Sequence, residues 1–195
     1  MSTGPERCGL VNELEYKSMK TLKTILIAVG LLLLVLIVAS QFLPSTYHVE
    51  RGVVIAARAD AIYPWINNLK KWPEWSAWTA AKDPTLVYQY EGPEEGVGAI
   101  SKWDAKKMGE GSMKVTASEA GKLVKFDLCF DHGKYLSRGT FTFEPSGDGT
   151  KVTWGMDGNV SRSPMDRYFS LLMDSMVGKD FEEGLRNLKA KAEGK

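Results

Sequence analysis

Few residues in this chain have the types and spacing that catalysis or metal binding requires. His48 and His132 are the two histidines, and neither belongs to a metal-ligand motif or to a serine or cysteine nucleophile pattern. Period-two alternation puts Asp127 and Asp157 on the wet face of the expected strands, so they cannot pair as acid and base inside a cavity. The sequence therefore predicts no catalytic residues, no bound metal and no cofactor.

Phosphate and nucleic-acid chemistry are also not expected. The glycine clusters at 96–98 and 147–149 are typical of turns, because neither follows a strand and opens a helix as a phosphate-binding loop does. The whole chain has 25 Lys+Arg and 24 Asp+Glu, and the part that begins at Pro44 has equal numbers of each. Without a basic run, we expect no nucleic-acid partner.

The residues that remain for an interior site are mostly apolar and aromatic, with a few hydroxyl groups, which suits ligand binding better than catalysis. Plain core packing explains the same residues equally well. Arg51 joins them because it alternates with Tyr47 and Val53 on one face of a strand, where it either holds an anionic head group or extends to water. The candidate ligand-binding residues are Arg51, Tyr88, Tyr90, Trp103, Phe126, Tyr135, Ser137, Phe141, Trp154, Met156, Phe169, Leu172, Met173 and Met176.

The elements that must position these residues are a series of short strands and one long C-terminal helix. Residues Pro164–Glu193 have helical spacing, with Ser163 as N-cap and with Gly178 and Gly184 weakening the middle. The fold class is therefore α+β, a curved antiparallel sheet of about seven strands wrapped around that helix, with a cavity between them. The expected strands are 47–55, 86–91, 99–104, 113–117, 123–130, 135–144 and 151–160.

Residues 56–78 connect the first two strands and have the spacing of two short helices. Three tryptophans, Trp72, Trp75 and Trp78, fall within this connection. Large aromatic side chains beneath a short helical cap are usually core, and stacking on a ligand is the alternative.

The N-terminal part predicts a membrane anchor. The residues from Ile25 to Leu43 carry no charge, and as a helix they cover roughly 28 Å, close to the thickness of a bilayer core. The expected organisation is a cytoplasmic tail at 1–23, a transmembrane helix at 24–43 and an extracytoplasmic domain at 44–195, because three lysines precede the span. A buried helix, or a signal peptide cleaved after residues 38–40 to release a secreted domain, is the alternative.

Several segments together resemble one superfamily. The strand HVERGVVI, the WPEWSAW turn, the TFTFEPSGDGTKVTWGMDG hairpin and the terminal GKDFEEGLRNLKAKAE are similar to the START-like, helix-grip superfamily called SRPBCC. The resemblance is to its polyketide cyclase/dehydrase-like branch with an N-terminal membrane anchor, over about residues 47–193. It implies a cavity for lipids, sterols, polyketides or other hydrophobic molecules, and it implies no particular reaction.

These observations predict a single-pass, membrane-anchored module that binds a hydrophobic small molecule or lipid between sheet and helix. Two alternatives stay open. One is an enzyme of cyclase, dehydratase or hydrolase type, in which Tyr135, Tyr88 or Arg51 polarises a carbonyl or moves a proton. The other is an accessory domain with a closed core that binds another envelope protein. The sequence identifies no particular protein partner.

Overall fold

The computed structural model describes residues 6–194, with side chains from Met19 onward. It divides into two compact units, Met1–Leu43 and Pro44–Lys195. The first unit is the helix α1, Glu6–Ser40, whose stretch Met19–Ser40 has a mean hydropathy of 2.8 and is the one described helix long and apolar enough to cross a membrane. Its 22 residues cover about 33 Å. A signal sequence near an N-terminus meets the same criterion. This stretch therefore fits both the membrane anchor and the signal peptide that the sequence suggested.

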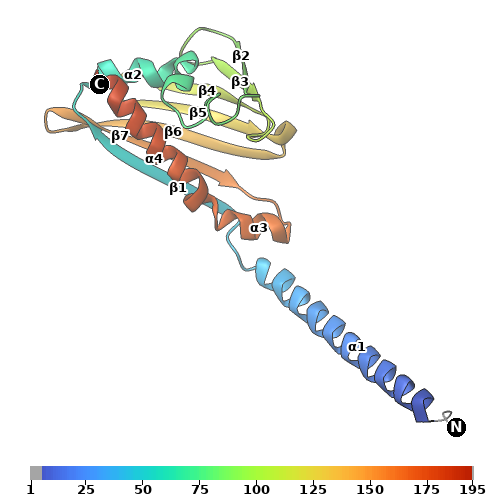
Figure 1. Ribbon diagram of the computed structural model, residues 1–195. Coiled ribbons are helices and arrows are strands. Elements are labelled where there is room, and N and C mark those ends of the chain that lie inside the picture. Colours follow the sequence, from blue (N-terminus) through green and yellow to red (C-terminus); the bar gives the residue numbers. More distant parts are fainter. Residues whose placement is uncertain (1–5, 195) are drawn as a thin grey trace. The chain divides into compact units, whose positions relative to one another are not determined.

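The second unit is a seven-stranded antiparallel sheet with helices on one side (Figure 1). The strand order is β1-β7-β6-β5-β4-β3-β2, so each strand from β2 to β7 pairs with its neighbour in sequence and β1 closes against β7. The chain passes from β1 to β2 through α2 (Ala59–Asn67) and the 3-10 helix η1 (Leu69–Glu74). The strands are β1 Thr46–Ile55, β2 Val87–Glu91, β3 Ile100–Asp104, β4 Gly111–Glu119, β5 Leu123–Phe130, β6 Tyr135–Ser146 and β7 Gly149–Asn159. This confirms the predicted fold class.

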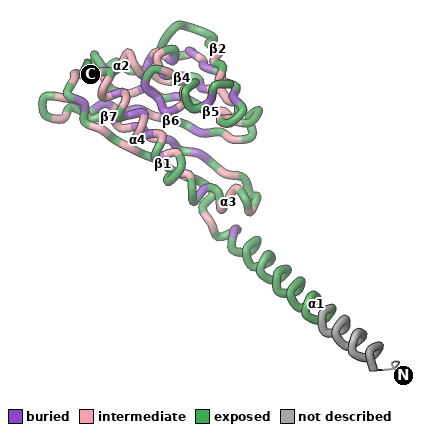
Figure 2. Tube along the Cα trace, viewed as in Figure 1, coloured by how far each residue is buried: buried purple, intermediate pink, exposed green. Residues whose placement is uncertain are grey.

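Alternation along the strands separates a buried face from a wet one. In β5, Val124 and Phe126 are buried while Lys125 and Asp127 are exposed. The same period holds in β7, where alternate residues from Thr150 to Gly158 are buried. Figure 2 shows the buried positions on the strands and on the sides of the helices that meet them. Because successive side chains of a strand point to opposite faces, the buried residues of β5 and β7, which are linked by the register through β6, share one face of the sheet.

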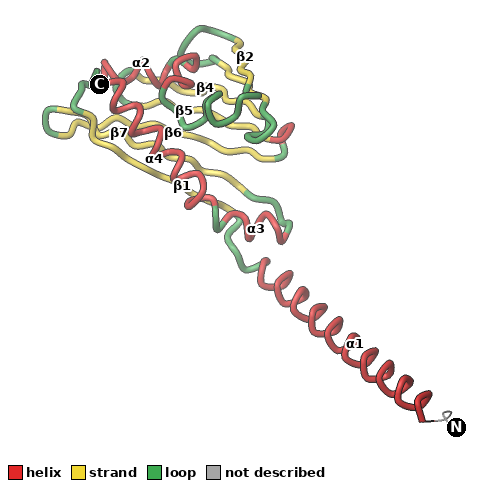
Figure 3. Tube along the Cα trace, in the orientation of Figure 1, coloured by secondary structure: helices red, strands yellow, loops and turns green. Residues whose placement is uncertain are grey.

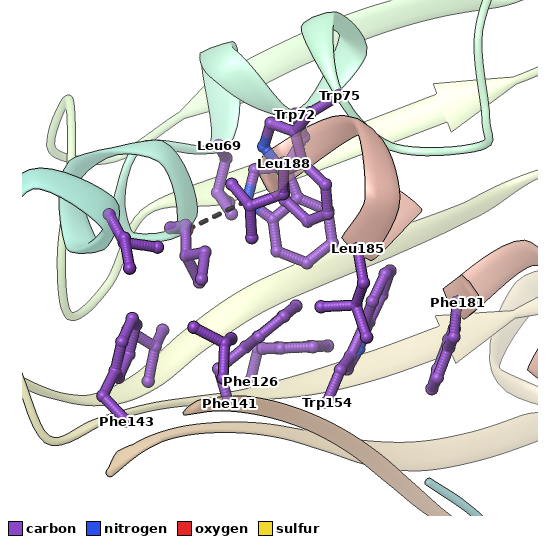
Figure 4. Packing of buried hydrophobic residues seen from close by; sticks show 14 of the residues in the cluster. Leu69, Trp72, Trp75, Phe126, Phe141, Phe143, Trp154, Phe181, Leu185 and Leu188 are labelled. Atoms are coloured by element: carbon purple, nitrogen blue, oxygen red, sulfur yellow. Dashed lines mark hydrogen bonds between the residues drawn. The ribbon is translucent and has the colours of Figure 1, made fainter. Parts of the chain in front are cut away.

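Aromatic rings fill much of the core between the sheet and the helices (Figure 4). The Trp154 ring is stacked between Phe181, at 3.9 Å between centroids, and Phe141, at 4.8 Å. Trp72 and Trp75 are buried, and their indole N–H groups donate to the backbone oxygens of Ile66 and Trp65. Trp72 and Trp75 are thus part of the core, as the composition of the turn indicated, whereas Trp78 is only partly buried.

The single C-terminal helix predicted from the sequence is wrong in one respect, because the structure has two helices there (Figure 3). Helix α3 spans Pro164–Ser170 and α4 spans Met173–Ala192. The amides of Leu171 and Leu172 bond to carbonyls three residues back, which tightens the turn and ends α3. Gly178 and Gly184, which were expected to weaken the helix, both lie inside α4. Because they have no side chain, the helix approaches the side chains of Arg51 and Trp154 closely there.

Candidate functional site

A cavity of about 620 Å³ lies between the sheet and helices α3 and α4. Its volume is typical of small-molecule sites, which range over about 300–1,000 Å³. All seven strands contribute lining residues on one side, and loops before β2 and after β3 complete the wall. Three lining side chains, Met165, Phe169 and Met176, are also exposed by 79%, 49% and 50%, so they mark the mouth of the cavity.

Three aromatic rings of the cavity lining lie against glycines of neighbouring strands. Trp103 pairs with Gly111, Phe126 with Gly139 and Tyr47 with Gly158 in the sheet register. A Cβ atom added to any of these glycines would come within 2.3 Å of the paired ring. Larger partners would push the rings off the sheet and into the cavity, so the glycines contribute to its volume.

Nine of the fourteen predicted site residues line the cavity. They come from β2 to β7 and from both C-terminal helices, which the fold brings together around one space. The nine are Tyr88, Trp103, Phe126, Tyr135, Trp154, Met156, Phe169, Met173 and Met176.

Four other predicted residues lie away from the cavity lining. Tyr90 stacks on Tyr88 and borders a smaller surface pocket, while Phe141 is fully buried in the aromatic core. Ser137 is buried behind Tyr47, with their hydroxyl oxygens 2.6 Å apart. Leu172 follows the end of α3 and is 53% exposed.

Arg51 also lies outside the cavity, because helix α4 covers it. Its guanidinium donates to both carboxylate oxygens of Asp174, at 2.8 and 3.2 Å, and to Glu182 at 2.7 Å. Gly178 lies directly against the guanidinium, where a Cβ would be 2.1 Å from Nη2. The hydrogen bonds from Arg51 lower the pKa of Asp174, and the two carboxylates raise that of Arg51. Arg51 thus fastens α4 to β1 instead of facing a ligand.

Two tyrosine hydroxyls at the cavity have partners inside the protein, whereas the buried indole N–H of Trp154, another lining residue, has no partner among the described residues. The Tyr88 hydroxyl donates to the Trp78 carbonyl at 3.0 Å, and Tyr135 donates to Asp166 at 3.3 Å. Burial, with a smaller effect of Tyr90, raises the pKa of Tyr88 to about 12. Burial also raises the pKa of Tyr47, against the opposing hydrogen bond with Ser137. Tyr88 and Tyr47 therefore keep their protons at neutral pH.

Two carboxylates, Asp166 and Asp180, reach the cavity lining, and each has a partner of its own. Asp166 accepts hydrogen bonds from Tyr135 and Ser161. Asp180 lies 3.5 Å from the Lys82 ammonium. Among the residues that the structure describes, no three His, Cys, Asp or Glu side chains are grouped to hold a metal ion.

The predicted site left out other lining residues. Stacking on a ligand was the alternative for Trp72 and Trp78, and for some of the others a signal was present. Leu128 and Phe130 share the alternating face of Phe126, while Phe181 follows the helical spacing from Phe169. The loop residues gave no such signal, because their positions depend on how the loops fold over the sheet. The additional lining residues are Tyr47, Trp72, Ser76, Trp78, Leu86, Ser101, Met108, Met113, Leu128, Phe130, Asn159, Val160, Met165, Asp166, Val177, Asp180 and Phe181.

A curved antiparallel sheet that holds an apolar cavity against a C-terminal helix defines a START-like, helix-grip protein. The chain belongs to the family described as polyketide cyclase/dehydrase and lipid transport, whose sequence model matches residues 46–193. This confirms the superfamily resemblance seen in the sequence. A comparison with curated protein sequences gave no match.

Solved structures show the same fold at low sequence identity. The di-domain ARO/CYC StfQ from the steffimycin biosynthetic pathway aligns with a TM-score of 0.60 and 14% identity, over 76% of this chain and 51% of that chain. Truncated norcoclaurine synthase from Thalictrum flavum aligns with a TM-score of 0.56 and 14% identity, over 75% and 92%. Protein CV1439 from Chromobacterium violaceum aligns with a TM-score of 0.51 and 17% identity, over 77% and 99%. This chain therefore spans about half the length of StfQ.

Proposed function

We propose that this protein is a membrane-anchored module that binds a hydrophobic small molecule or a lipid in the cavity between its sheet and its C-terminal helices. The observation that carries the proposal is the cavity of about 620 Å³, whose lining is dominated by aromatic, Met and Leu side chains. Burial of apolar ligand surface there would supply the binding free energy, at about 25 cal/mol per Å². The description of the family as including lipid transport supports this ligand class.

The proposal places the uncharged stretch at 24–43, which contains most of the apolar part of α1, in a bilayer, with the N-terminus in the cytoplasm and the domain outside. Its length and hydropathy support a span. The lysines that precede the predicted span support this orientation. An anchor of this kind keeps the cavity beside a reservoir of hydrophobic ligands.

An enzymatic role has less support from the geometry. Catalysis of a cyclisation or dehydration would need a base and a donor converging on one point of the cavity. The hydroxyls of Tyr88 and Tyr135 are engaged with protein acceptors, and Arg51 lies outside the lining. We therefore propose binding without chemistry.

The test is native mass spectrometry of the full chain, purified in a mild detergent and compared with the same sample after organic extraction. We expect a discrete added mass that extraction removes. The protein mass itself reports whether the N-terminal segment is retained or cleaved. A bare protein mass, unchanged after incubation with membrane lipids, would refute ligand binding and favour the accessory-domain alternative.

A matched pair of variants assigns the ligand to the cavity. Leu128→Trp adds a ring to the cavity wall, whereas Leu136→Trp makes the same change at a position that is 61% exposed and outside the lining. We expect Leu128→Trp to reduce the occupancy of the added mass several-fold and Leu136→Trp to leave it unchanged. Equal occupancy in both variants would place the ligand elsewhere.

A further inference from the structure

An exposed apolar patch lies on α3 and on the first turn of α4. Between residues 44 and 194, ten large apolar side chains are exposed, and five of them fall within twelve consecutive residues. Clusters of this kind mark interaction sites, whereas single exposed apolar residues are ordinary. We call this cluster the α3 patch; its members are Met165 (79% exposed), Phe169 (49%), Leu171 (54%), Leu172 (53%) and Met176 (50%).

The α3 patch is at the end of the domain where the chain enters. Helix α3 follows β7, which pairs with β1, and the Val160 amide just after β7 donates to the Ser45 carbonyl at 2.9 Å. From Ser40, the last residue of α1, to Ser45 is five residue steps, at most about 18 Å of extended chain. If α1 spans a bilayer as proposed above, this end of the domain stays near the lipid head groups in any orientation.

We propose that the α3 patch docks on the surface of the bilayer that holds α1, so that the cavity opens onto lipid. This inference rests on the proposed membrane anchor. Three members of the patch, Met165, Phe169 and Met176, also line the mouth of the cavity. A hydrophobic ligand can therefore pass between the bilayer and the cavity without crossing water. Amphipathic helices that expose Phe and Leu side chains bind at lipid interfaces by burying their apolar face there.

Each of the three charged side chains within the patch segment forms hydrogen bonds inside the protein. The Asp166 carboxylate accepts hydrogen bonds from two hydroxyl groups. Arg167 Nε donates to the Ser161 carbonyl at 3.2 Å, and Asp174 is held by Arg51. These hydrogen bonds lower the cost of moving the three side chains toward an interface.

The test uses the full chain in vesicles of phosphatidylcholine and phosphatidylglycerol, with Cys8 and Cys129 replaced by serine. A nitroxide spin label is attached at Leu172→Cys, in the patch but outside the cavity lining. The matched control is Val97→Cys, which is 59% exposed in the turn between β2 and β3. Each label is measured for its collision rates with oxygen, which concentrates in lipid, and with a water-soluble nickel complex.

We expect the oxygen-to-nickel collision ratio to be several-fold higher at residue 172 than at residue 97, and a label at Met165→Cys to behave like the one at 172. Equal ratios, with all labels in water, would overturn the proposal. Dipolar broadening between labels at 172 on two chains would also overturn it, since a second copy would then cover the patch.

An alkaline carbonate wash of the same vesicles separates the two proposals. A chain that stays with the vesicles but carries a water-exposed label at 172 leaves the anchor standing and refutes docking. Removal of the chain by the wash would refute the membrane anchor, and it would also refute the docking proposal, which depends on that anchor.

Discussion

The replacement Gly139→Ala tests whether glycines opposite aromatic rings shape the cavity. The added Cβ would be 2.0 Å from Phe126 Cε2 and 2.2 Å from Cζ, so the ring cannot keep its position. Phe126 is buried and makes edge contact with Trp72 at 5.4 Å between centroids, so its displacement disturbs the aromatic core. Forcing an additional carbon atom into a packed site costs about 1–3 kcal/mol. For a chain of this size that lowers the melting temperature by about 2–12 °C.

The assay is thermal unfolding of the full chain in detergent, combined with the occupancy of the ligand mass described above. The matched control is Gly155→Ala, where the nearest atom to the new Cβ is 3.8 Å away. There the relief of glycine's backbone entropy predicts a gain of about 0.5–1 kcal/mol. We expect Gly139→Ala to be less stable than the wild type and to hold less ligand, because Phe126 is pushed toward the cavity. Equal stability of the two variants would refute this account of the glycines.

Three further predictions concern the frame around the cavity. Arg51→Gln should lower the melting temperature, because Asp174 and Glu182 of α4 lose their partner. The control Arg58→Gln removes an exposed ion pair and should leave the melting temperature unchanged. Equal effects of the two variants in a thermal scan would contradict the role of Arg51 in holding α4 against β1. The pKa of Asp83 is lowered to about 2 by hydrogen bonds to its carboxylate, so its stabilisation is present above its ordinary value of 3.8 and is lost as pH falls from about 4 to about 2. In Asp83→Asn, the melting temperature should therefore change less with pH over that window than in the wild type. Parallel profiles of melting temperature against pH for the two proteins would refute this. Phe181→Ala should cost about 3–5 kcal/mol in denaturant unfolding, whereas the half-exposed Phe169→Ala should cost much less; similar midpoints would show that the stacked ring is not central to the core.

The sequence predicted the architecture well because each element carries its own local period. Strand β5 begins and ends where the alternation of Leu123 to Phe130 begins and ends. The turn with Trp72 and Trp75 was expected to be core, and its composition alone favoured this. The break between α3 and α4 was not anticipated, because the apolar spacing continues across Leu171 and nothing local marks an end.

The sequence by itself determined which residues face inward, since alternation is a property of a single strand. Only the tertiary structure decided which of them are core and which line the cavity. Phe126 and Phe141 share the inner face of neighbouring strands, yet Phe126 lines the cavity and Phe141 is enclosed among Trp75 and Trp154. Arg51 likewise faces inward and is covered by α4. These differences depend on where α4 and the loops cross the sheet, and contacts between residues far apart in the chain set that placement.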